Sequence, residues 1–548
     1  MADDDTATTA PLLTSHKQQG KPPKAPTIDD TIENYIGTTG VMQLFKAVLL
    51  AFAWAFDAQQ VFISVFTDAE PQWHCTGTSP ASCSPSAPPA SPCGLPSGSW
   101  AWDRPVDTTV VSEWALKCAG PALVSLPASS FFAGCLAGGF LLTTLADSLL
   151  GRRKMLLTSL VSMSVAGVLT AFAPNVWAYA ALRFVSGFGR SMVGTCTLVL
   201  STELVGKRWR DTVSVAGFFF FTVGFLSLPA LGYTFREASW RNMYLWTSVP
   251  SLCYSVLLYF LAQESPRWLL VRGRKQDAMD TLQQIASLNG HSITSSFSML
   301  HACTMHADND MDNKAGGVFA TMRSMWERPW ALRRLAAIMT ASFGVGMVYY
   351  GMPLNVGSLG TNLYMSVTYN AMAELPSAIL SLAFIGKVNR RSTVMVLTAT
   401  AGAFSLMCVA IPEGSPARMA AELLSFFATI TAFNLILIYS IELFPTSVRN
   451  SAVGMVRQAL VLGGVAAPVL VALGRERSFW SFGVFGLCIG CSGLFAACLP
   501  ETKGRSMSDT MEEEEQKQKQ EATAIVAACT GGGGGATDIA TKDNSDAV

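Results

Sequence analysis

The sequence predicts an all-α membrane protein with twelve transmembrane helices in two six-helix halves. Three observations predict this class. Half of the 548 residues are apolar and only 14% are charged, whereas a soluble chain carries roughly a quarter charged residues. The apolar residues arrive in runs of about twenty, the length that a helix needs to cross a ~30 Å hydrocarbon core. An internal repeat then divides the chain in two.

The repeat consists of three short motifs that recur about 238 residues further on, each directly after a long apolar run. Three matches at one offset are not expected by chance. Membrane proteins built from two parallel halves carry their binding site between the halves, near the bilayer midplane. The recurring pairs are Gly151-Arg152-Arg153-Lys154 with Asn389-Arg390-Arg391-Ser392, Glu203-Leu204 and Arg210 with Glu442-Leu443 and Arg449, and Glu264-Ser265-Pro266 with Glu501-Thr502-Lys503.

The apolar runs fix the order of the elements along the chain. Lys and Arg are concentrated in the loops on the side of the N-terminus, which predicts an integral multi-pass protein with both termini in the cytosol. Plasma membrane and vacuolar membrane both fit. The predicted spans are 41–66, 122–146, 155–173, 176–200, 212–235, 242–262, 335–354, 361–386, 393–412, 417–441, 451–473 and 479–499.

Polar segments flank and divide the two halves. The leader and the tail have compositions typical of disorder. The expected organisation is a cytosolic leader 1–35, an N-terminal half 36–263 with an external loop 67–120, a cytosolic central loop 264–333, a C-terminal half 334–500 and a cytosolic tail 501–548.

Four cysteines, Cys75, Cys83, Cys93 and Cys118, fall in the external loop. On the oxidising side of a membrane they are expected to form two disulfides, with three alternative connectivities. All five histidines lie outside the spans. Neither a metal-ligand spacing nor a nucleophile–base set occurs within the spans. We therefore expect no metal, no cofactor and no enzymatic activity. A net charge of zero gives no case for nucleic acid.

Acidic and basic residues bound the short cytosolic loops of both halves. Such residues can form an ion-pair network that stabilises one conformation of a rocking carrier and breaks in the other. Plain positive-inside anchors are the alternative, but an anchor has no need to repeat an acid–base spacing in both halves. The candidate gating residues are Asp147, Arg152, Arg153, Glu203, Arg210, Glu442 and Arg449.

Five ionisable residues fall well inside predicted spans: Asp57, Arg183, Arg190, Glu374 and Arg457. Each costs ~2.5–3.5 kcal/mol at a helix centre even on a lenient scale, so they are not expected to face lipid. Two acids and three bases can neutralise one another as a buried scaffold. For Arg183 and Arg457 both a role in that scaffold and a functional role stay open.

Glu374 is the leading candidate for a binding site. Pro376 follows it and is expected to disturb the backbone in mid-span, as broken helices do around the binding sites of other transporters. The preceding span carries several glycines together with Tyr349 and Tyr350, which indicates a flexible, aromatic-bearing helix. A carboxylate beside aromatic faces suits a bulky organic cation, because each ring adds ~0.5–2 kcal/mol of cation–π attraction. The alternative is that the tyrosines merely pack.

Asp57 lies between two aromatic residues and two glutamines within 54–60. It can bind a cation, carry a coupling proton or pair with Arg190. Burial raises a carboxyl pKa and a nearby Arg lowers it, and the sequence does not choose between these outcomes.

Together these residues resemble the major facilitator superfamily and, within it, the organic cation transporters, with plant organic cation/carnitine transporters as the nearest likeness. The resemblance covers Tyr35 to Arg505. It implies that Tyr349 and Glu374 contact cationic substrates and that Asn434 is a polar position of the cavity. The motifs that carry it are Phe56-Asp57-Ala58-Gln59-Gln60, Trp73-His74-Cys75, Glu264-Ser265-Pro266-Arg267-Trp268-Leu269, Asn362-Leu363-Tyr364, Glu442-Leu443-Phe444-Pro445-Thr446-Ser447-Val448-Arg449-Asn450 and Pro500-Glu501-Thr502-Lys503-Gly504.

Two departures from the family pattern matter. The superfamily loop motif Asp-Arg-x-Gly-Arg is here Asp147-Ser148-Leu149-Leu150-Gly151, which lacks that Arg and has one residue more. The acid that animal cation carriers place before the Gly-Gly of span eleven is here Val461, with Arg457 one turn earlier. Arg457 can meet the carboxylate of a zwitterion such as carnitine while Glu374 takes its quaternary ammonium.

The predicted function is secondary active transport of small organic cations or zwitterions by alternating access. The driving force is a proton gradient or the membrane potential, which supplies ~2.3 kcal/mol per charge per 100 mV. A monomer in contact with membrane lipid is expected. One rival is a sugar or other neutral-solute porter, because Pro500-Glu501-Thr502-Lys503-Gly504 also occurs there. The other is a membrane receptor of the same fold that binds without transporting.

Overall fold

The computed structural model describes only part of the chain. Asp147 and the predicted leader lie outside the described residues, as do half of the central loop and most of the tail. The described residues are 40–76, 83, 92–96, 98–145, 150–288, 323, 325–384, 387–445, 447–475, 477–503, 508, 510–517, 519, 520 and 523.

The described residues form helices at all twelve predicted spans, which confirms the fold class. The N-terminal spans are α2, α3 and α4 in direct succession (Val41–Ala51, Ala53–Phe62 and Ser64–Thr67), α6 (Pro121–Leu145), α7 (Arg152–Thr170), α8 with α9 (Val176–Arg190 and Val193–Glu203), α10 (Lys207–Thr234) and α11 (Trp240–Leu261).

The C-terminal half repeats this order. Eight of the helices in the described part of the chain are long and apolar enough to cross a membrane on their own, and α7, α8 with α9, α17 and α21 supply the remaining spans. The C-terminal spans are α16 (Pro329–Asn355) with η4 (Val356–Leu359), α17 (Leu363–Phe384), α18 (Arg390–Ala410), α19 (Pro416–Leu443), α20 (Arg449–Gly474), and η5 (Ser478–Trp480) with α21 (Phe482–Leu494) and η6 (Phe495–Cys498).

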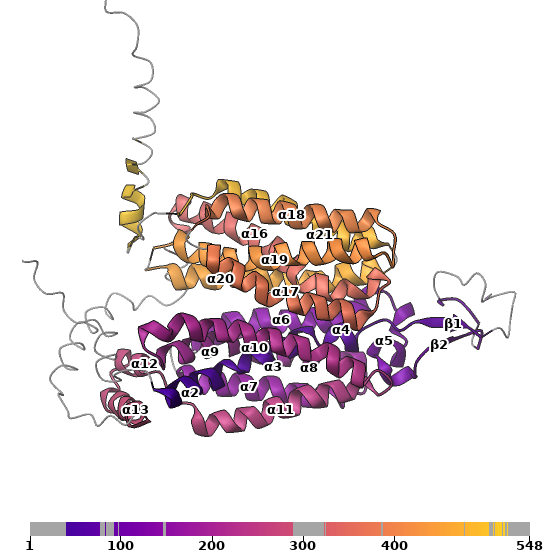
Figure 1. Ribbon diagram of the computed structural model, residues 1–548, viewed down its shortest axis with the longest axis horizontal. Helices are drawn as coiled ribbons and strands as arrows, with labels where there is room; N and C mark the ends of the chain where they lie inside the picture. Colours follow the sequence, from indigo (N-terminus) through magenta and orange to yellow (C-terminus); the bar gives the residue numbers. More distant parts are fainter. Residues whose placement is uncertain are drawn as a thin grey trace, which may run out of the picture.

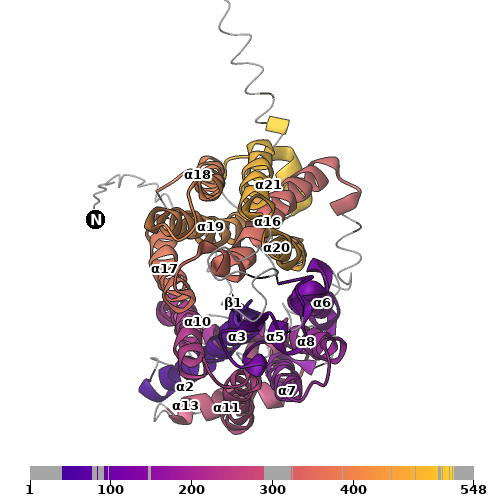
Figure 2. The same cartoon turned by 90° about the vertical axis from the view of Figure 1, so that its right-hand side faces the viewer.

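The two halves lie side by side with their helices roughly parallel. In Figure 1 the N-terminal half forms the lower layer and the C-terminal half the upper one, and Figure 2 shows the same two bundles nearly end-on. Helix α6 packs against α20 of the other half, and α10 packs against α17. The surface between the halves is therefore built mainly from these four helices.

The helix boundaries follow from local capping. Asn175 begins α8 by accepting a hydrogen bond from the backbone N–H of Ala178, at 2.9 Å. Ser265 caps α12 (Pro266–Val271) in the same way, with Pro266 at the first helical position, where its missing N–H costs nothing. Helix α13 (Lys275–Leu288) follows at the same end of the molecule, which we call the α13 end (Figure 1).

Helix α17 runs without interruption from Leu363 to Phe384, straight through Pro376. Whatever disturbance Pro376 causes, it does not interrupt the helix at Glu374. A proline removes one backbone hydrogen bond and crowds the preceding turn, but neighbouring helices in a membrane bundle can hold such a helix together.

The opposite end of the molecule carries a small cysteine-bearing segment, and we call it the disulfide end. Strand β1 (Trp73–Cys75) pairs antiparallel with β2 (Trp100–Trp102), and η1 (Val106–Thr108), α5 (Val110–Glu113) and η2 (Leu116–Cys118) follow. Two disulfides join Cys75 to Cys83 and Cys93 to Cys118. The structure thus selects one of the three connectivities that the sequence left open.

Glu113 of α5 ties this segment to the helical bundle. It accepts hydrogen bonds from Trp240 Nε1 at 2.5 Å and from Arg241 Nη1 at 2.6 Å. Burial raises the pKa of Glu113, but the hydrogen bonds from Arg241 and Trp240, with the charge of Arg241, outweigh it and lower that pKa below its ordinary value. The contact is therefore maintained at neutral pH.

Candidate functional site

Glu374 lies buried on α17 and is bound by a tyrosine of the neighbouring α16. Tyr349 donates its hydroxyl to Glu374 Oε1 at 2.9 Å. Glu374 is 8% exposed and Tyr349 5% exposed. Within the part of the chain that the structure describes, no Lys or Arg nitrogen lies within ion-pair distance of this carboxylate. A buried acid without a basic partner is costly, so Glu374 is suited to a cationic ligand.

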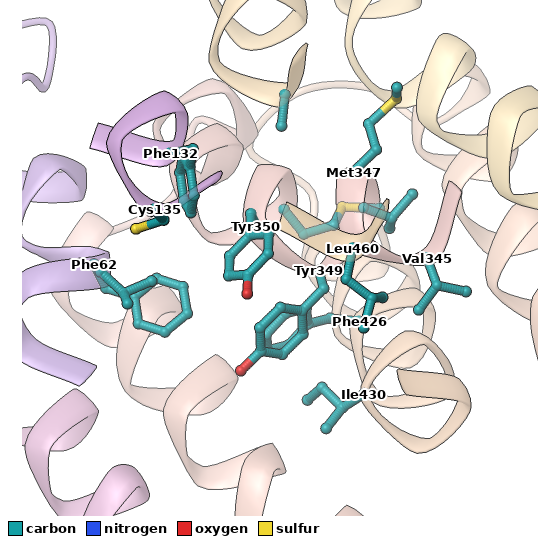
Figure 3. Close-up of a cluster of buried hydrophobic side chains, with 14 of the residues drawn as sticks. Phe62, Phe132, Cys135, Val345, Met347, Tyr349, Tyr350, Phe426, Ile430 and Leu460 are labelled. Atoms are coloured by element: carbon teal, nitrogen blue, oxygen red, sulfur yellow. The ribbon is translucent and has the colours of Figure 1, made fainter. Parts of the chain in front are cut away.

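Three aromatic rings of the C-terminal half pack around the ring of Tyr349. The ring of Tyr349 lies 4.6 Å from Phe433, 5.0 Å from Tyr350 and 6.0 Å from Phe426, measured between centroids. Figure 3 shows Tyr349 and Tyr350 side by side, with Phe62 of the N-terminal half nearby. These rings offer the π-faces that a bulky cation needs beside the carboxylate.

The aromatic cluster spans the surface between the two halves. Tyr350 lies 4.6 Å from Phe132 of α6, and Tyr349 lies 6.3 Å from Phe62 of α3 (Figure 3). Phe62 in turn stacks on Phe225 of α10 at 4.0 Å. A movement of one half against the other must therefore rearrange the rings beside Glu374.

Asp57 lies across the interface on α3 and pairs with Arg190 of α8. Arg190 Nη2 lies 2.9 Å from Asp57 Oδ2, and the Asp57 side chain is 2% exposed. Of the three roles that the sequence left open, pairing with Arg190 is the one that this geometry displays. Arg190 also donates weakly to Cys135 Sγ, at 3.8 Å.

The two remaining predicted binding residues lie on the C-terminal side of the interface. Arg457 of α20 donates through Nη1 to Thr195 Oγ1 of α9 at 2.9 Å, a contact that joins the halves. Asn434 is half-buried on α19 and follows Phe433 in the sequence, whose ring packs on Tyr349. The structure thus brings Glu374, Tyr349 and Tyr350 together and sets Asp57 and Arg457 on the two sides of the same interface.

The repeated motifs at the α13 end form two matching networks, one in each half. Glu264 accepts the backbone N–H groups of Arg152 and Arg153 at 2.9 and 3.1 Å and so caps the start of α7. Glu501 accepts those of Arg390 and Arg391 at 2.8 and 3.2 Å and caps α18. A carboxylate at a helix N-terminus satisfies otherwise unpaired donors and meets the positive end of the helix dipole.

Gly151 makes the first of these caps sterically possible. Its φ is +78°, which L side chains rarely adopt, and an added Cβ would lie 2.6 Å from Glu264 Oε2. Only glycine fits both requirements.

The acids at the ends of α9 and α19 complete the two networks. Ser265 donates to Glu203, and Thr502 donates to Glu442 at 2.6 Å. Glu442 also pairs with Arg390 through Nη2 at 3.1 Å. Arg449 donates from Nε to the Phe444 carbonyl at 3.3 Å.

The sequence repeat suggested Glu442 with Arg449, whereas the structure pairs Glu442 with Arg390. Arg153 reaches the Tyr259 carbonyl at 2.7 Å. Arg152 begins α7 and Arg210 lies in the first turn of α10. The gating role of all these residues stays a prediction.

A cavity of about 1000 Å³ opens at the disulfide end between the two halves. Its lining includes Asp68 and Glu70 from the N-terminal half and Tyr364 and Arg475 from the C-terminal half. Arg475 Nη2 donates to the Asp68 carbonyl at 3.0 Å, and its Nη1 lies 3.7 Å from Glu70 Oε2. None of the six predicted binding residues lines this cavity.

Residues 108–513 match the family model of sugar (and other) transporters. Organic cation/carnitine transporters 2 and 3 of Arabidopsis thaliana are each 49% identical to this chain, over 516 and 507 residues, and cover 92% of it with 96% and 97% of their own lengths. Rat solute carrier family 22 member 3 is 32% identical over 432 residues, which are 78% of this chain and 74% of that protein.

This chain belongs to the major facilitator superfamily, in the organic cation/carnitine transporter family. Solved structures agree on the fold. A proton:xylose symporter of the superfamily, bound to 6-bromo-6-deoxy-D-glucose, superposes with a TM-score of 0.58 at 17% identity, over 87% of this chain and 98% of its own. The inward open xylose transporter from E. coli gives 0.57 at 17% identity, over 84% and 97%. The protein is therefore an integral membrane transporter.

Sequence reasoning missed two buried acids, Asp68 just past the first predicted span and Glu422. Glu422 of α19 is 1% exposed and accepts a hydrogen bond from Asn370 Nδ2 of α17 at 2.9 Å. Asn370 lies one helical turn before Glu374. Arg418, one turn before Glu422, is 2% exposed and lies 3.3 Å from Glu413. Both Arg418 and Glu422 fall inside the predicted span 417–441, so a complete count of charges in that span would have found them.

Proposed function

We propose that this chain is a secondary active carrier of small organic cations or zwitterions that works by alternating access. The observation that carries the proposal is Glu374, a buried carboxylate at the interface of the halves. Its partner is the hydroxyl of Tyr349, whose ring packs against other aromatic rings, and among the described residues no Lys or Arg pairs with it. Such a site is complementary to a cation with an apolar surface. The printed names of the Arabidopsis relatives, organic cation/carnitine transporters, support the same substrate class.

Arg457 extends the proposal to zwitterions. Its guanidinium reaches across the interface to Thr195, and guanidinium is well suited to a carboxylate. Glu374 would hold the quaternary ammonium of carnitine, and Arg457 its carboxylate. Asp57, Tyr350 and Asn434 would complete the lining.

The energetics of the cycle belong to the same proposal. A proton gradient or the membrane potential drives uptake. The contacts between the acidic and basic residues at the α13 end break and re-form as the halves rock. The α13 end and both termini face the cytosol, and the disulfide end faces an oxidising compartment at the plasma or vacuolar membrane. The carrier acts as a monomer and needs no cofactor.

The test is uptake of radiolabelled tetraethylammonium and carnitine into proteoliposomes with an imposed inward proton gradient. Wild type should show saturable uptake of both compounds. Glu374→Gln keeps the shape and removes the charge, so tetraethylammonium uptake should fall at least tenfold. Arg457→Gln should reduce carnitine uptake more than tetraethylammonium uptake. Glu237→Gln is the matched control, because that acid is 76% exposed.

Unchanged uptake by Glu374→Gln would move the cation site elsewhere, with Asp57 as the next candidate. A neutral-solute porter is the second candidate function, because the fold is shared with xylose transporters. Uptake of glucose or xylose without either test compound, by protein shown to be folded, would favour it.

A further inference from the structure

A polar seam runs through the interior of the N-terminal half. Four polar residues, three in span one at positions 57, 60 and 64 and one at position 68 directly after α4, are spaced three or four apart and therefore lie on one face. Helices α3 and α4 are separated only by Ile63, whose backbone is helical, so the face is continuous. The four residues are Asp57, Gln60, Ser64 and Asp68, and each is at most 6% exposed.

Helix α8 presents a second polar stripe against the first. Tyr179, Arg183, Ser186 and Arg190 follow the same helical spacing. Tyr179 donates to Asp68 Oδ1 at 2.7 Å. Arg183 Nη2 donates to the Gln60 carbonyl and to Ser64 Oγ, both at 3.2 Å, and Arg190 pairs with Asp57. The seam thus holds one acid at each end, about 16 Å apart along the helix.

One end of the seam opens on the disulfide-end cavity. Both Ser64 and Asp68 line that cavity, although Asp68 is 94% buried. Its Oδ1 atom is bound by Tyr179, whereas its Oδ2 atom has no hydrogen-bond partner among the described residues. Asp68 therefore combines a place in the cavity lining with a buried, unpartnered carboxylate oxygen.

Unsatisfied polar atoms continue along the seam. Buried polar groups in proteins are nearly always hydrogen-bonded, and water serves where protein atoms do not. Water molecules held by such a row of polar atoms can pass a proton from one to the next, whereas the guanidinium groups hold the water but have no lone pair with which to accept the proton themselves. Among the described residues, the buried atoms of the seam without a partner are Asp68 Oδ2, Gln60 Oε1, Arg183 Nε and Nη1, Ser186 Oγ and Arg190 Nε.

The seam is closed on the side of α6. An added Cβ at Gly187 of α8 would lie 1.9 Å from the Phe131 carbonyl of α6, and the Arg183 guanidinium lies 4.2 Å from the Phe131 ring. Tetraethylammonium or carnitine cannot pass between α6 and α8, whereas the polar groups along the seam are suited to proton transfer.

We propose that Asp68 is the proton port of this carrier and that the seam conducts the proton from the disulfide-end cavity to Asp57. The proposal rests on the proposed carrier function and assigns its coupling ion. A proton from the cavity binds Asp68 Oδ2, moves along the seam and neutralises Asp57. The Asp57–Arg190 ion pair then breaks. Release of the proton from Asp57 on the side of the α13 end restores the pair.

The charged and titratable groups that face Asp68 determine how strongly it binds the proton. Tyr179 and Arg183 face it from α8, and Tyr244 of α11 bonds the Tyr179 hydroxyl at 2.8 Å. Arg475 binds the Asp68 carbonyl from the other half. Asp57 at the far end faces Arg190, with Arg457 of α20 as a further positive charge.

The test compares two assays in proteoliposomes containing the full chain. Counterflow of tetraethylammonium at equal pH on both sides reports the carrier without a net proton flux, and uptake under an inward proton gradient reports coupling. Asp68→Asn should leave counterflow within about twofold of wild type and should remove at least nine-tenths of the stimulation by the gradient. Asp103→Asn is the control, because Asp103 lines the same cavity but is exposed and bound to His74.

Tyr179→Phe gives a second readout that retains the ring packing. It should weaken the stimulation and shift its pH dependence without affecting counterflow. A full gradient response in Asp68→Asn would overturn the proposal, and so would loss of counterflow in a folded variant, which indicates a structural role. Wild-type counterflow without any gradient response would overturn the port but leave the carrier intact. Absence of wild-type counterflow would overturn the carrier and the port together.

Discussion

At the residue scale, the candidate site depends on side chains whose partners lie on other helices. Glu374 and Tyr349 are 25 residues apart in the sequence and 2.9 Å apart in the structure. The tyrosine contributes both a hydrogen bond and a ring, and these two contributions can be separated by substitution.

Tyr349→Phe removes the hydroxyl and keeps the ring, so the KM for tetraethylammonium should change modestly, by about two- to tenfold, as expected for one hydrogen bond of ~0.5–1.5 kcal/mol. Tyr349→Ala also removes the cation–π contact and should raise the KM further. Uptake kinetics in proteoliposomes measure both. Tyr369→Phe, on the same helix as Glu374 but 38% exposed, should behave as wild type. An equal effect of Phe and Ala at position 349 would contradict a role for the ring.

The sequence could identify most of these residues but not their partners. Apolar runs and the cost of a buried charge are enough to single out Asp57 and Glu374. The choice of Arg190 for Asp57 depends on how α3 and α8 pack, which no spacing within one helix determines. Glu442 illustrates the same limit, because the repeat suggests Arg449 and the fold supplies Arg390.

At the element scale, the glycines of α16 serve packing. The sequence suggested a flexible helix at this span. In the structure an added Cβ at Gly346 would lie 2.1 Å from the Leu460 carbonyl of α20, and one at Gly463 of α20 would lie 2.4 Å from the Phe343 carbonyl. Small residues allow membrane helices to approach closely. The two helices that hold Tyr349 and Arg457 are therefore in direct backbone contact.

Gly346→Ala should destabilise the protein, because the added methyl group forces α16 and α20 apart at a typical cost of ~1–3 kcal/mol. Thermal unfolding in detergent, followed by tryptophan fluorescence, should show a lower Tm. Gly454→Ala on α20 is the matched control: its Cβ would meet nothing within 4 Å, and alanine is the better helix former by ~1 kcal/mol. Equal losses of Tm in the two variants would contradict this account of the packing.

At the scale of the whole molecule, the internal repeat predicts the two halves and their matching networks at the α13 end. Glu264 and Glu501 cap equivalent helices, as their positions in the repeat suggest. Contacts between the halves do not follow from the repeat, since they join residues that have no counterpart in the other half. Arg475 and its partners Asp68 and Glu70 are such a contact, and the long separation in sequence left no pattern to detect.

Arg475 is expected to hold the two halves together at the disulfide end. Arg475→Gln removes the ion pair with Glu70 and weakens the hydrogen bond to the Asp68 carbonyl. Losing ~1 kcal/mol from one conformation changes the population ratio about fivefold. The shift should favour the state in which the disulfide-end cavity is wider.

Ser125 lines that cavity and is 4% exposed, so a Ser125→Cys thiol should react about fivefold faster with a membrane-impermeant reagent when Arg475→Gln is present. The same protein without Ser125→Cys gives the background. Arg477→Gln is the control, because Arg477 lines the same cavity two residues on and is exposed. Equal labelling rates for Ser125→Cys alone, with Arg475→Gln and with Arg477→Gln would show that Arg475 does not bias the position of the halves.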